Sequence, residues 1–243
     1  MALVTGASRG IGRVSALALA EAGAHVIAVA RTQGALEELD DEIRSRGGER
    51  ATLVPMDITN GKGWDELGYA IFQRHARLDI LVHAAATLSG LRPASHIPPV
   101  VWDRVVATNL TSVFRLIRSL EPLLKASEAG RAIFLTSGRA IRPKAFWGAY
   151  AATKAGLEAF VRCWADEVDT TALRAVLLDP GVMRTKMRAE GFPGEDPLTL
   201  VDPAEIGPLI VELALAPYLG PPTQNVHFSD WRSARLAASP GKL

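Results

Sequence analysis

Short runs of apolar residues alternate along this chain with longer stretches in which apolar side chains recur at helical spacing. The short runs contain few charges, which is typical of strands that are buried on both faces of a parallel sheet. The pattern predicts seven such strands, at residues 2–5, 25–30, 51–55, 80–83, 132–136, 174–178 and 225–228.

The longer stretches predict helices, because each has charged residues on one side and Leu, Ile, Val or Ala on the other. They lie at residues 11–23, 34–47, 60–76, 100–127, 149–169 and 203–216. We therefore expect an α/β fold of one domain over residues 1–228, with a doubly wound seven-stranded parallel sheet and helices on both faces. Residues 181–200 predict a mobile loop or short helices over a site, and residues 229–243 a poorly ordered tail.

Composition agrees with one soluble α/β domain, since the 243 residues are 48% hydrophobic and 22% charged. The net charge of +1 provides no long-range field for a polyanion, so nucleic acid is not an expected partner. The histidines lack metal-ligand spacing, and no metal is predicted. Cys163 has no disulfide partner and, between Val161 and Trp164, is expected to be a buried packing residue.

Hydropathy argues against a membrane location. No apolar run reaches the roughly 18 to 20 residues that a membrane span needs, and no signal-peptide pattern is visible. We expect a cytoplasmic protein without a membrane partner.

A glycine-rich segment follows the first strand and leads into a helix: Thr5-Gly6-Ala7-Ser8-Arg9-Gly10-Ile11-Gly12. Glycines here permit a tight turn and a close approach of the backbone to a pyrophosphate, which the helix N-terminus also attracts. Such a cluster alone is weak, because ordinary turns contain it too. Its position between strand and helix favours a dinucleotide site that includes Ser8, Arg9 and Ile11.

A second group of residues suggests catalysis. Tyr150 and Lys154 are four residues apart on a predicted helix and therefore share one face. Ser137 follows a predicted strand at the edge of the sheet where ligands bind in such folds, and Asn109 lies in the preceding long helix. Taken singly these residues have ordinary structural explanations. Their combined spacing favours a catalytic set.

The T-G-x-x-x-G-x-G spacing at 5–12 and the Y-x-x-x-K at 150–154 resemble the classical short-chain dehydrogenase/reductase family, from Leu3 to about Phe228. The resemblance implies a Rossmann fold and an enzyme that interconverts a carbonyl and an alcohol by hydride transfer with a nicotinamide dinucleotide. It implies that Tyr150 is the general acid and base and that Lys154 lowers its pKa and holds the nicotinamide ribose. Ser137 would polarise the substrate carbonyl, and Asn109 would orient a water.

Further cofactor contacts follow from the same resemblance. Asp57 would contact the adenine with Ile58 as its backbone neighbour, although Asp57 is equally explained as a helix cap. The segment 179–185 resembles P-G-x-x-x-T, so the nicotinamide end would be held by Pro180, Gly181, Val182 and Thr185. The alternative is a Pro-Gly turn before an exposed helix.

Arg31 suggests which dinucleotide is bound. An NAD site usually has an acidic residue after the second strand, where this chain has Ala30-Arg31-Thr32. Arg31 and Arg9 would clamp a 2′-phosphate, so NADP(H) is the preferred cofactor and NAD(H) a possible one. The alternative is two solvated arginines.

The chain departs from the family at 83–86, where His-Ala-Ala-Ala replaces N-N-A-G. Ala84 is still expected beside the cofactor, with looser binding of the adenosine side. His83 is either a compensating hydrogen-bond partner or a plain strand-end residue, and we favour the second.

The substrate is the least defined feature. Ser137, Arg139, Trp147 and Tyr150 are the expected contacts of a small carbonyl or alcohol substrate. Phe146 and Trp147 would line an apolar site, while the cations at 139, 142 and 144 would attract an anionic group or are simply solvated. The family implies a homodimer or homotetramer. A cofactor-binding sensor with little turnover is the alternative function.

Overall fold

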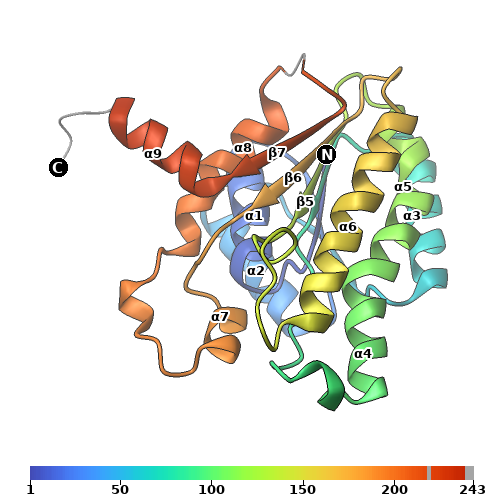
Figure 1. Cartoon of the computed structure of the whole chain (residues 1–243). Coiled ribbons are helices and arrows are strands. Elements are labelled where there is room, and N and C mark those ends of the chain that lie inside the picture. Colours follow the sequence, from blue (N-terminus) through green and yellow to red (C-terminus); the bar gives the residue numbers. More distant parts are fainter. Residues whose placement is uncertain (218–219, 239–243) are drawn as a thin grey trace.

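The computed structural model describes residues 1–217 and 220–238. Within this part of the chain one seven-stranded parallel sheet has the order β3-β2-β1-β4-β5-β6-β7 (Figure 1). All seven expected strands are present, with ends shifted by at most two residues. They are β1 (Ala2–Thr5), β2 (Val26–Ala30), β3 (Thr52–Pro55), β4 (Ile80–His83), β5 (Arg131–Leu135), β6 (Arg174–Asp179) and β7 (Thr223–His227).

Helices connect the strands as the periodicity predicts. They are α1 (Gly10–Glu21), α2 (Gln33–Ser45), α3 (Gly61–His75), α4 (Pro99–Val106), α5 (Ser112–Lys125), α6 (Gly148–Glu167), α7 (Lys186–Gly191), α8 (Gly207–Leu215) and α9 (Phe228–Ala238). The segment 181–200 contains α7 and a 3₁₀ turn at Pro197–Thr199, so it forms the short helices that were one of its two expected forms. In the described residues, no helix has both the length and the hydrophobicity to cross a membrane.

Each face of the sheet has its own layer of helices, because successive side chains of a buried strand point to opposite sides. On β1, Val4 packs in a cluster with α1, α2 and α8. Leu3 packs on the other side with α3, α5 and α6. Figure 1 shows the two layers on either side of the sheet. The doubly wound arrangement expected from the sequence is confirmed.

The long helix expected at 100–127 is divided into α4 and α5 by a π-helical turn at Ala107–Thr111. This wider turn contains Asn109, which is fully buried and hydrogen-bonded to the backbone of Thr87. Single π turns of this kind are frequent at functional sites. The apolar pattern predicts one continuous helix, because it keeps its helical period on each side of the turn and only the phase between the two sides shifts.

The prediction for Cys163 is wrong, because its side chain is exposed. Val161 and Trp164 of the same helix are buried against the sheet. Side chains two positions apart on a helix point about 200° away from each other. Cys163 therefore points away from the face on which Val161 is buried.

The C-terminal segment also differs from the prediction, since residues 229–238 belong to α9 instead of a poorly ordered tail. Phe228 is buried, and the indole N–H of Trp231 donates to Glu212 on α8 at 2.9 Å. Arg232 pairs with Glu205 at 2.7 Å. These contacts fix the helix against the domain, and the rest of the predicted tail, 239–243, lies outside the described residues.

Candidate active site

The candidate site lies at the carboxyl edge of the sheet, where the strand order reverses between β1 and β4. Both strands are parallel and adjacent, with Thr5 opposite His83 in the register. Their connections leave in opposite directions, which opens a crevice for ligands in doubly wound sheets. The glycine segment follows β1, and Ser137 follows β5, so the topology brings both predicted groups to this edge.

The glycine segment turns tightly against neighbouring backbone. Gly6 has a φ of +68°, and a Cβ atom there would lie 2.9 Å from the backbone nitrogen of Ala85. A Cβ on Gly12 would lie 2.3 Å from the carbonyl oxygen of Gly6. Helix α1 begins at Gly10 directly after the exposed Arg9. The loop therefore fits a pyrophosphate, which would meet backbone and a helix N-terminus without obstruction by side chains.

The segment after β6 lies beside this loop. A Cβ on Gly10 would come 3.7 Å from the Thr185 side chain, and Thr185 caps α7 by accepting from the Arg188 N–H at 3.2 Å. Gly181 has a φ of +68° and donates its N–H to Asp179 at 2.9 Å. The structure thus brings together the two predicted cofactor segments, which include Ser8, Ile11, Pro180 and Val182.

Arg31 and Asp57 lie at the ends of the neighbouring strands β2 and β3. Their charged groups are 3.9 Å apart and both side chains are largely exposed. Partial burial would raise the pKa of Asp57, but two hydrogen bonds from Thr59 and the charge of Arg31 lower it below its usual range. The helix-cap alternative for Asp57 is wrong, because Asn60 caps α3. Ile58 is buried next to it.

His83, which stands where the family motif has asparagine, links β4 to β1 through a hydrogen bond with Thr5. The Thr5 hydroxyl accepts from the N–H groups of Ala84 and Ala85, each at 3.2 Å, so its own proton points to His83 Nδ1 at 3.0 Å. The favoured prediction of a plain strand-end residue is therefore wrong. Complete burial lowers the pKa of His83 to about 3, and the charge of Lys154 acts in the same direction.

Three of the predicted catalytic residues meet at the start of α6. The Lys154 Nζ lies 5.8 Å from the ring centroid of Tyr150 and donates to the Leu135 carbonyl at 2.7 Å. The Ser137 side chain lies near the Tyr150 hydroxyl and favours its charged form. Leu135 and Ser137 are two residues apart at the end of β5. The end of this one strand therefore positions the groups that lie against Lys154 and Tyr150 of α6.

Burial dominates the electrostatics of this group. It raises the pKa of Tyr150 to about 12 against the Ser137 hydrogen bond, and the Asp179 carboxylate adds to the rise. Burial lowers the pKa of Lys154 to about 8, while the charges of Glu158 and Asp179 oppose that fall. At neutral pH, Tyr150 therefore holds its proton and Lys154 is mostly charged.

Glu158 is a part of the site that sequence reasoning missed. Its carboxylate accepts from the Thr136 hydroxyl at 2.5 Å and pairs with Arg162 at 2.7 Å, and its side chain is buried. It lies one turn after Lys154 on α6. The available signal was the four-residue spacing of positions 150, 154 and 158, which places all three side chains on one helix face.

A family comparison matches this geometry. The model described as short chain dehydrogenase matches residues 1–196 of the chain. The chain belongs to the short chain dehydrogenase family.

Individual members of the family resemble the chain over most of its length. The uncharacterized oxidoreductase YciK of Escherichia coli K12 is 38% identical over 213 residues, which are 87% of this chain and 84% of YciK. The structure of a short chain dehydrogenase from Salmonella enterica serovar Typhi has a TM-score of 0.89 at 34% identity, and the match covers 93% of this chain and 94% of that one. A short chain dehydrogenase from Shigella flexneri 2a, solved in complex with NADP, has a TM-score of 0.84 at 37% identity, and the match covers 88% and 90% of the two chains. The protein is accordingly an oxidoreductase of this family.

Asn109 of this short chain dehydrogenase links the loop after β4 to α6. Its side chain accepts from the Thr87 N–H at 2.8 Å and donates to the Thr87 carbonyl at 2.9 Å and to Thr153 at 3.2 Å. Thr153 directly precedes Lys154. The structure therefore brings Asn109 to the other three catalytic positions, and the orientation of a water by Asn109 stays a prediction.

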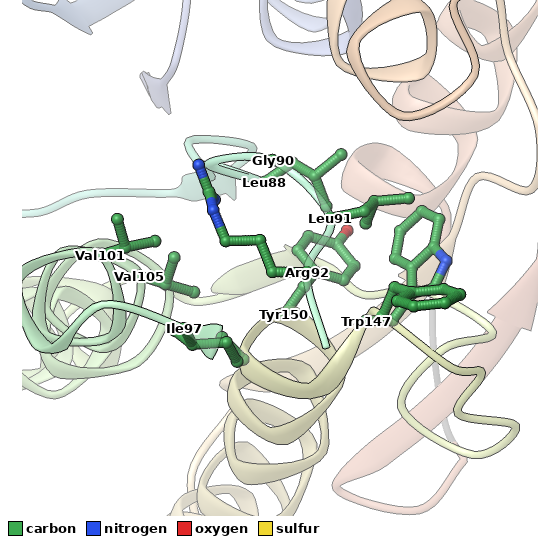
Figure 2. A pocket seen from close by; sticks show the side chains of 11 residues that line it. Leu88, Gly90, Leu91, Arg92, Ile97, Val101, Val105, Trp147 and Tyr150 are labelled. Carbon is green, nitrogen blue, oxygen red and sulfur yellow. The ribbon is translucent and has the colours of Figure 1, made fainter. Parts of the chain in front are cut away.

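A small cavity lies beside Tyr150, between α4, α6 and the loop after β4 (Figure 2). Trp147 packs against Tyr150 with ring centroids 5.7 Å apart, so two of the predicted substrate contacts border it. Arg139 lies 5.3 Å from the Trp147 ring and is not part of the lining. The lining residues are Leu88, Gly90, Leu91, Arg92, Ile97, Val101, Val105, Phe146, Trp147, Ala149 and Tyr150.

Most of these lining residues were missed by sequence reasoning. A signal existed on α4, since positions 97, 101 and 105 are apolar at intervals of four residues. The loop at 88–92 carried no readable signal, because its contribution depends on how it folds back over α6.

Proposed function

We propose that this short chain dehydrogenase interconverts a carbonyl compound and its alcohol, with NADP(H) as preferred cofactor and Tyr150 as general acid and base. The observation that carries the proposal is the buried Tyr150, which lies near Ser137 and Lys154 and borders a cavity at the carboxyl edge of the sheet. An acid or base must lie within hydrogen-bond reach of the reacting oxygen, and a ligand in this cavity would meet that condition.

The nicotinamide ring, when bound, would supply or accept the hydride at the substrate carbon. In reduction, Ser137 would donate a hydrogen bond to the carbonyl oxygen, and the Tyr150 proton would pass to that oxygen as the alcohol forms. The raised pKa of Tyr150 keeps the proton in place at neutral pH. Oxidation reverses these steps, and the Lys154 ammonium would stabilise the Tyr150 phenolate that accepts the alcohol proton.

The preference for NADP(H) is supported by Arg31. Its guanidinium stands at the end of β2, where an acidic residue would favour the ribose hydroxyls of NAD(H), and it is largely exposed. Its ion pair with Asp57 is long, at 3.9 Å, so a 2′-phosphate would be a stronger partner. The exposed Arg9 lies on the same edge. The bound NADP of the Shigella relative agrees with this assignment, and NAD(H) is expected to be a weaker substitute.

Assembly into a homodimer or homotetramer is part of the proposal. Phe72 on α3 and Phe114 on the adjacent α5 are large apolar side chains that are about half exposed. Exposed aromatic residues on neighbouring helices are typical of contact surfaces between subunits.

The decisive experiment compares Tyr150→Phe with a matched control, Tyr69→Phe, whose ring is exposed on α3. The Tyr150 variant keeps the ring beside Trp147 and loses the proton, so kcat for NADPH-dependent reduction should fall about 10²–10⁴-fold. The control should be unchanged. The assay follows NADPH absorbance over a panel of ketones, aldehydes and quinones. A Tyr150→Phe variant with more than about a tenth of wild-type kcat would refute the proton-donor role.

The same assay separates the enzyme from a cofactor sensor. Wild-type protein that binds NADPH in a fluorescence titration but turns over no member of the panel would favour the sensor. Saturable turnover favours the enzyme.

A further inference from the structure

The wall of the cavity beside Tyr150 is apolar on several sides. Leu88 and Leu91 come from the loop after β4, and Ile97, Val101 and Val105 come from α4 and the turn before it. The Trp147 ring closes the side next to Tyr150. Figure 2 shows Leu91 and Trp147 on the side of Tyr150 that carries the hydroxyl, whereas Ile97, Val101 and Val105 lie on the other side, beyond Arg92. A substrate whose oxygen contacts that hydroxyl would therefore place its neighbouring group against aliphatic and indole surface.

Among the described residues that line this cavity, Arg92 is the one with a charged side chain. Its guanidinium donates to the Ser89 carbonyl at 2.5 Å and packs over Gly90. Figure 2 shows it turned away from Tyr150 and Trp147. The aliphatic stem of Arg92 is therefore the part that faces a ligand beside Tyr150.

The other cations near the site lie outside the cavity. Arg139 stacks on Trp147 and donates to the Arg142 carbonyl at 3.1 Å, and Lys144 is exposed. An anionic group inside the cavity would lose its hydration without gaining a direct ion pair from these residues, which is unfavourable.

We propose that the substrate presents an uncharged, extended apolar group, aromatic or aliphatic, to this cavity. The proposal rests on the proposed function, because Tyr150 marks the reacting end of the substrate. It sets aside the anionic group that the sequence left open as one explanation of the loop cations, the other being solvated charges.

A second cavity gives the direction in which such a group extends. The free volume beside Tyr150 is about 10 Å³, so a substrate must displace side chains to enter. Ile97 lines both this space and a surface cavity of about 420 Å³, which also borders Trp102 and Asp103. A long apolar group would move Ile97 and lie against Trp102. The Asp103 carboxylate would repel an anionic end there.

The loop at 90–92 covers one side of the cavity, and its hydrogen bonds would have to break for a ligand to enter. The Arg92 N–H donates to the Phe146 carbonyl at 3.1 Å, and the Gly90 N–H donates to Glu190 of α7 at 2.9 Å. Phe146 has a φ of +74°, a left-handed conformation that is unfavourable for an aromatic residue. These two bonds have to break if the loop at 90–92 moves to admit a ligand, whereas the hydrogen bonds within α6 stay in place.

The test compares two ketones that differ in one substituent: an aryl alkyl ketone and the same ketone with a carboxylate on the ring position opposite the carbonyl. The uncharged ketone should have a kcat/KM at least about tenfold higher with NADPH. Calorimetry with NADP⁺-saturated enzyme should give the same order of affinity without turnover. Equal or tighter binding of the carboxylate, or binding of neither ketone, would overturn the inference.

Variants at Ile97 test the direction of the substrate. Ile97→Ala should join the two cavities and raise kcat/KM for ketones with a long alkyl chain relative to short ones, by about tenfold. Val100→Ala is the matched control, since Val100 is 70% exposed on the adjoining helix and outside the lining. An unchanged chain-length profile in Ile97→Ala would overturn the extension past Ile97.

The two proposals fail in different ways. If the uncharged ketone binds more tightly than the carboxylate ketone but is never reduced, the proposed reaction is wrong and the inference about the cavity stands. If the Tyr150→Phe variant loses kcat and the carboxylate ketone is nevertheless preferred, the proposed function stands and the substrate class is wrong.

Discussion

The carboxyl edge of the sheet has two halves that differ in burial. In the cofactor half, after β1, β2 and β3, the side chains expected to hold the adenosine end are exposed: Arg9, Arg31 and Asp57. In the catalytic half, around β5 and α6, Asn109, Tyr150, Lys154 and Glu158 are buried. Arg31 has one long ion pair, at 3.9 Å, whereas Asn109 makes three hydrogen bonds of 3.2 Å or less.

This difference shows how each half obtains its geometry. A buried polar group must be bonded within the protein, because no water is available to replace a lost partner. The side chains proposed as catalytic are therefore placed by the fold itself, and we expect the exposed side chains of the cofactor half to take their final positions when a ligand binds. Changes in the catalytic half should act on kcat, and changes in the cofactor half on cofactor affinity.

The largest effect is expected for Lys154→Met, which keeps the aliphatic stem and removes the charge. Without the ammonium, the Tyr150 phenolate loses its stabilising cation, so kcat for alcohol oxidation should fall at least about 100-fold. The measurement is steady-state kinetics with NADP⁺. Lys62→Met on the exposed face of α3 is the control. If kcat of the Lys154 variant stayed within about threefold of wild type, the catalytic half would not depend on its buried charge.

A smaller and more selective effect is expected for Arg31→Ala in the cofactor half. Loss of a charge-assisted bond to the 2′-phosphate should reduce kcat/KM for NADPH about tenfold or more and leave the value for NADH nearly unchanged. Arg44→Ala on α2, also exposed, controls for a general loss of positive charge. An equal fall for both cofactors would show that Arg31 supports the fold and not the 2′-phosphate. Comparable wild-type kcat/KM for both would refute the preference itself.

The same contrast explains what the sequence could predict. The strands, the glycine loop and the spacing of Ser137, Tyr150 and Lys154 are local patterns with a strong periodic context, so they were recognisable. Glu158 was missed because its role depends on Thr136, which is distant in sequence and close only after β5 packs on α6. His83 was misjudged for the same reason, since its partner Thr5 lies 78 positions away.

The lining of the cavity was missed for a different reason. Leu91 and Arg92 belong to a loop whose position is set by bonds to Phe146 and to α7 rather than by any local pattern. The number of loop cations is visible in the sequence, which left an anionic substrate open as an alternative to solvated charges. Their place outside the lining of the cavity is visible only in the structure.

His83 lies on the boundary of the two halves and provides a test of stability. Its pKa is about 3 in the folded protein and near 6.5 when unfolded, so between these values the unfolded chain binds a proton that the folded protein excludes. The free energy of unfolding should therefore fall as pH falls through this range, by up to about 1.4 kcal/mol per pH unit from this group.

The His83→Asn variant removes this titration and keeps a polar group near Thr5. Its free energy of unfolding, measured with urea between about pH 4.5 and 7, should fall less steeply than that of wild type. His96→Asn replaces an exposed histidine in the turn before α4 and should reproduce the wild-type slope. Parallel slopes for all three proteins would mean that His83 is not the buried, neutral group described above.

The smallest effect is expected for Asp179→Asn at the end of β6, the strand next to β5 of the catalytic half. The Asp179 carboxylate raises the pKa values of both Tyr150 and Lys154. Without it both values fall, so both limbs of the pH profile of alcohol oxidation should move to lower pH: Tyr150 becomes a base earlier, and Lys154 loses its charge earlier. The plateau rate should change little, because Asn can still accept the Gly181 N–H bond. Asp196→Asn is the matched control, since that carboxylate makes the same turn bond, to Leu198, at 2.9 Å on the surface. A shift of one limb alone would show that Asp179 acts on only one of the two residues. An unchanged profile would show that the Asp179 charge affects neither Tyr150 nor Lys154.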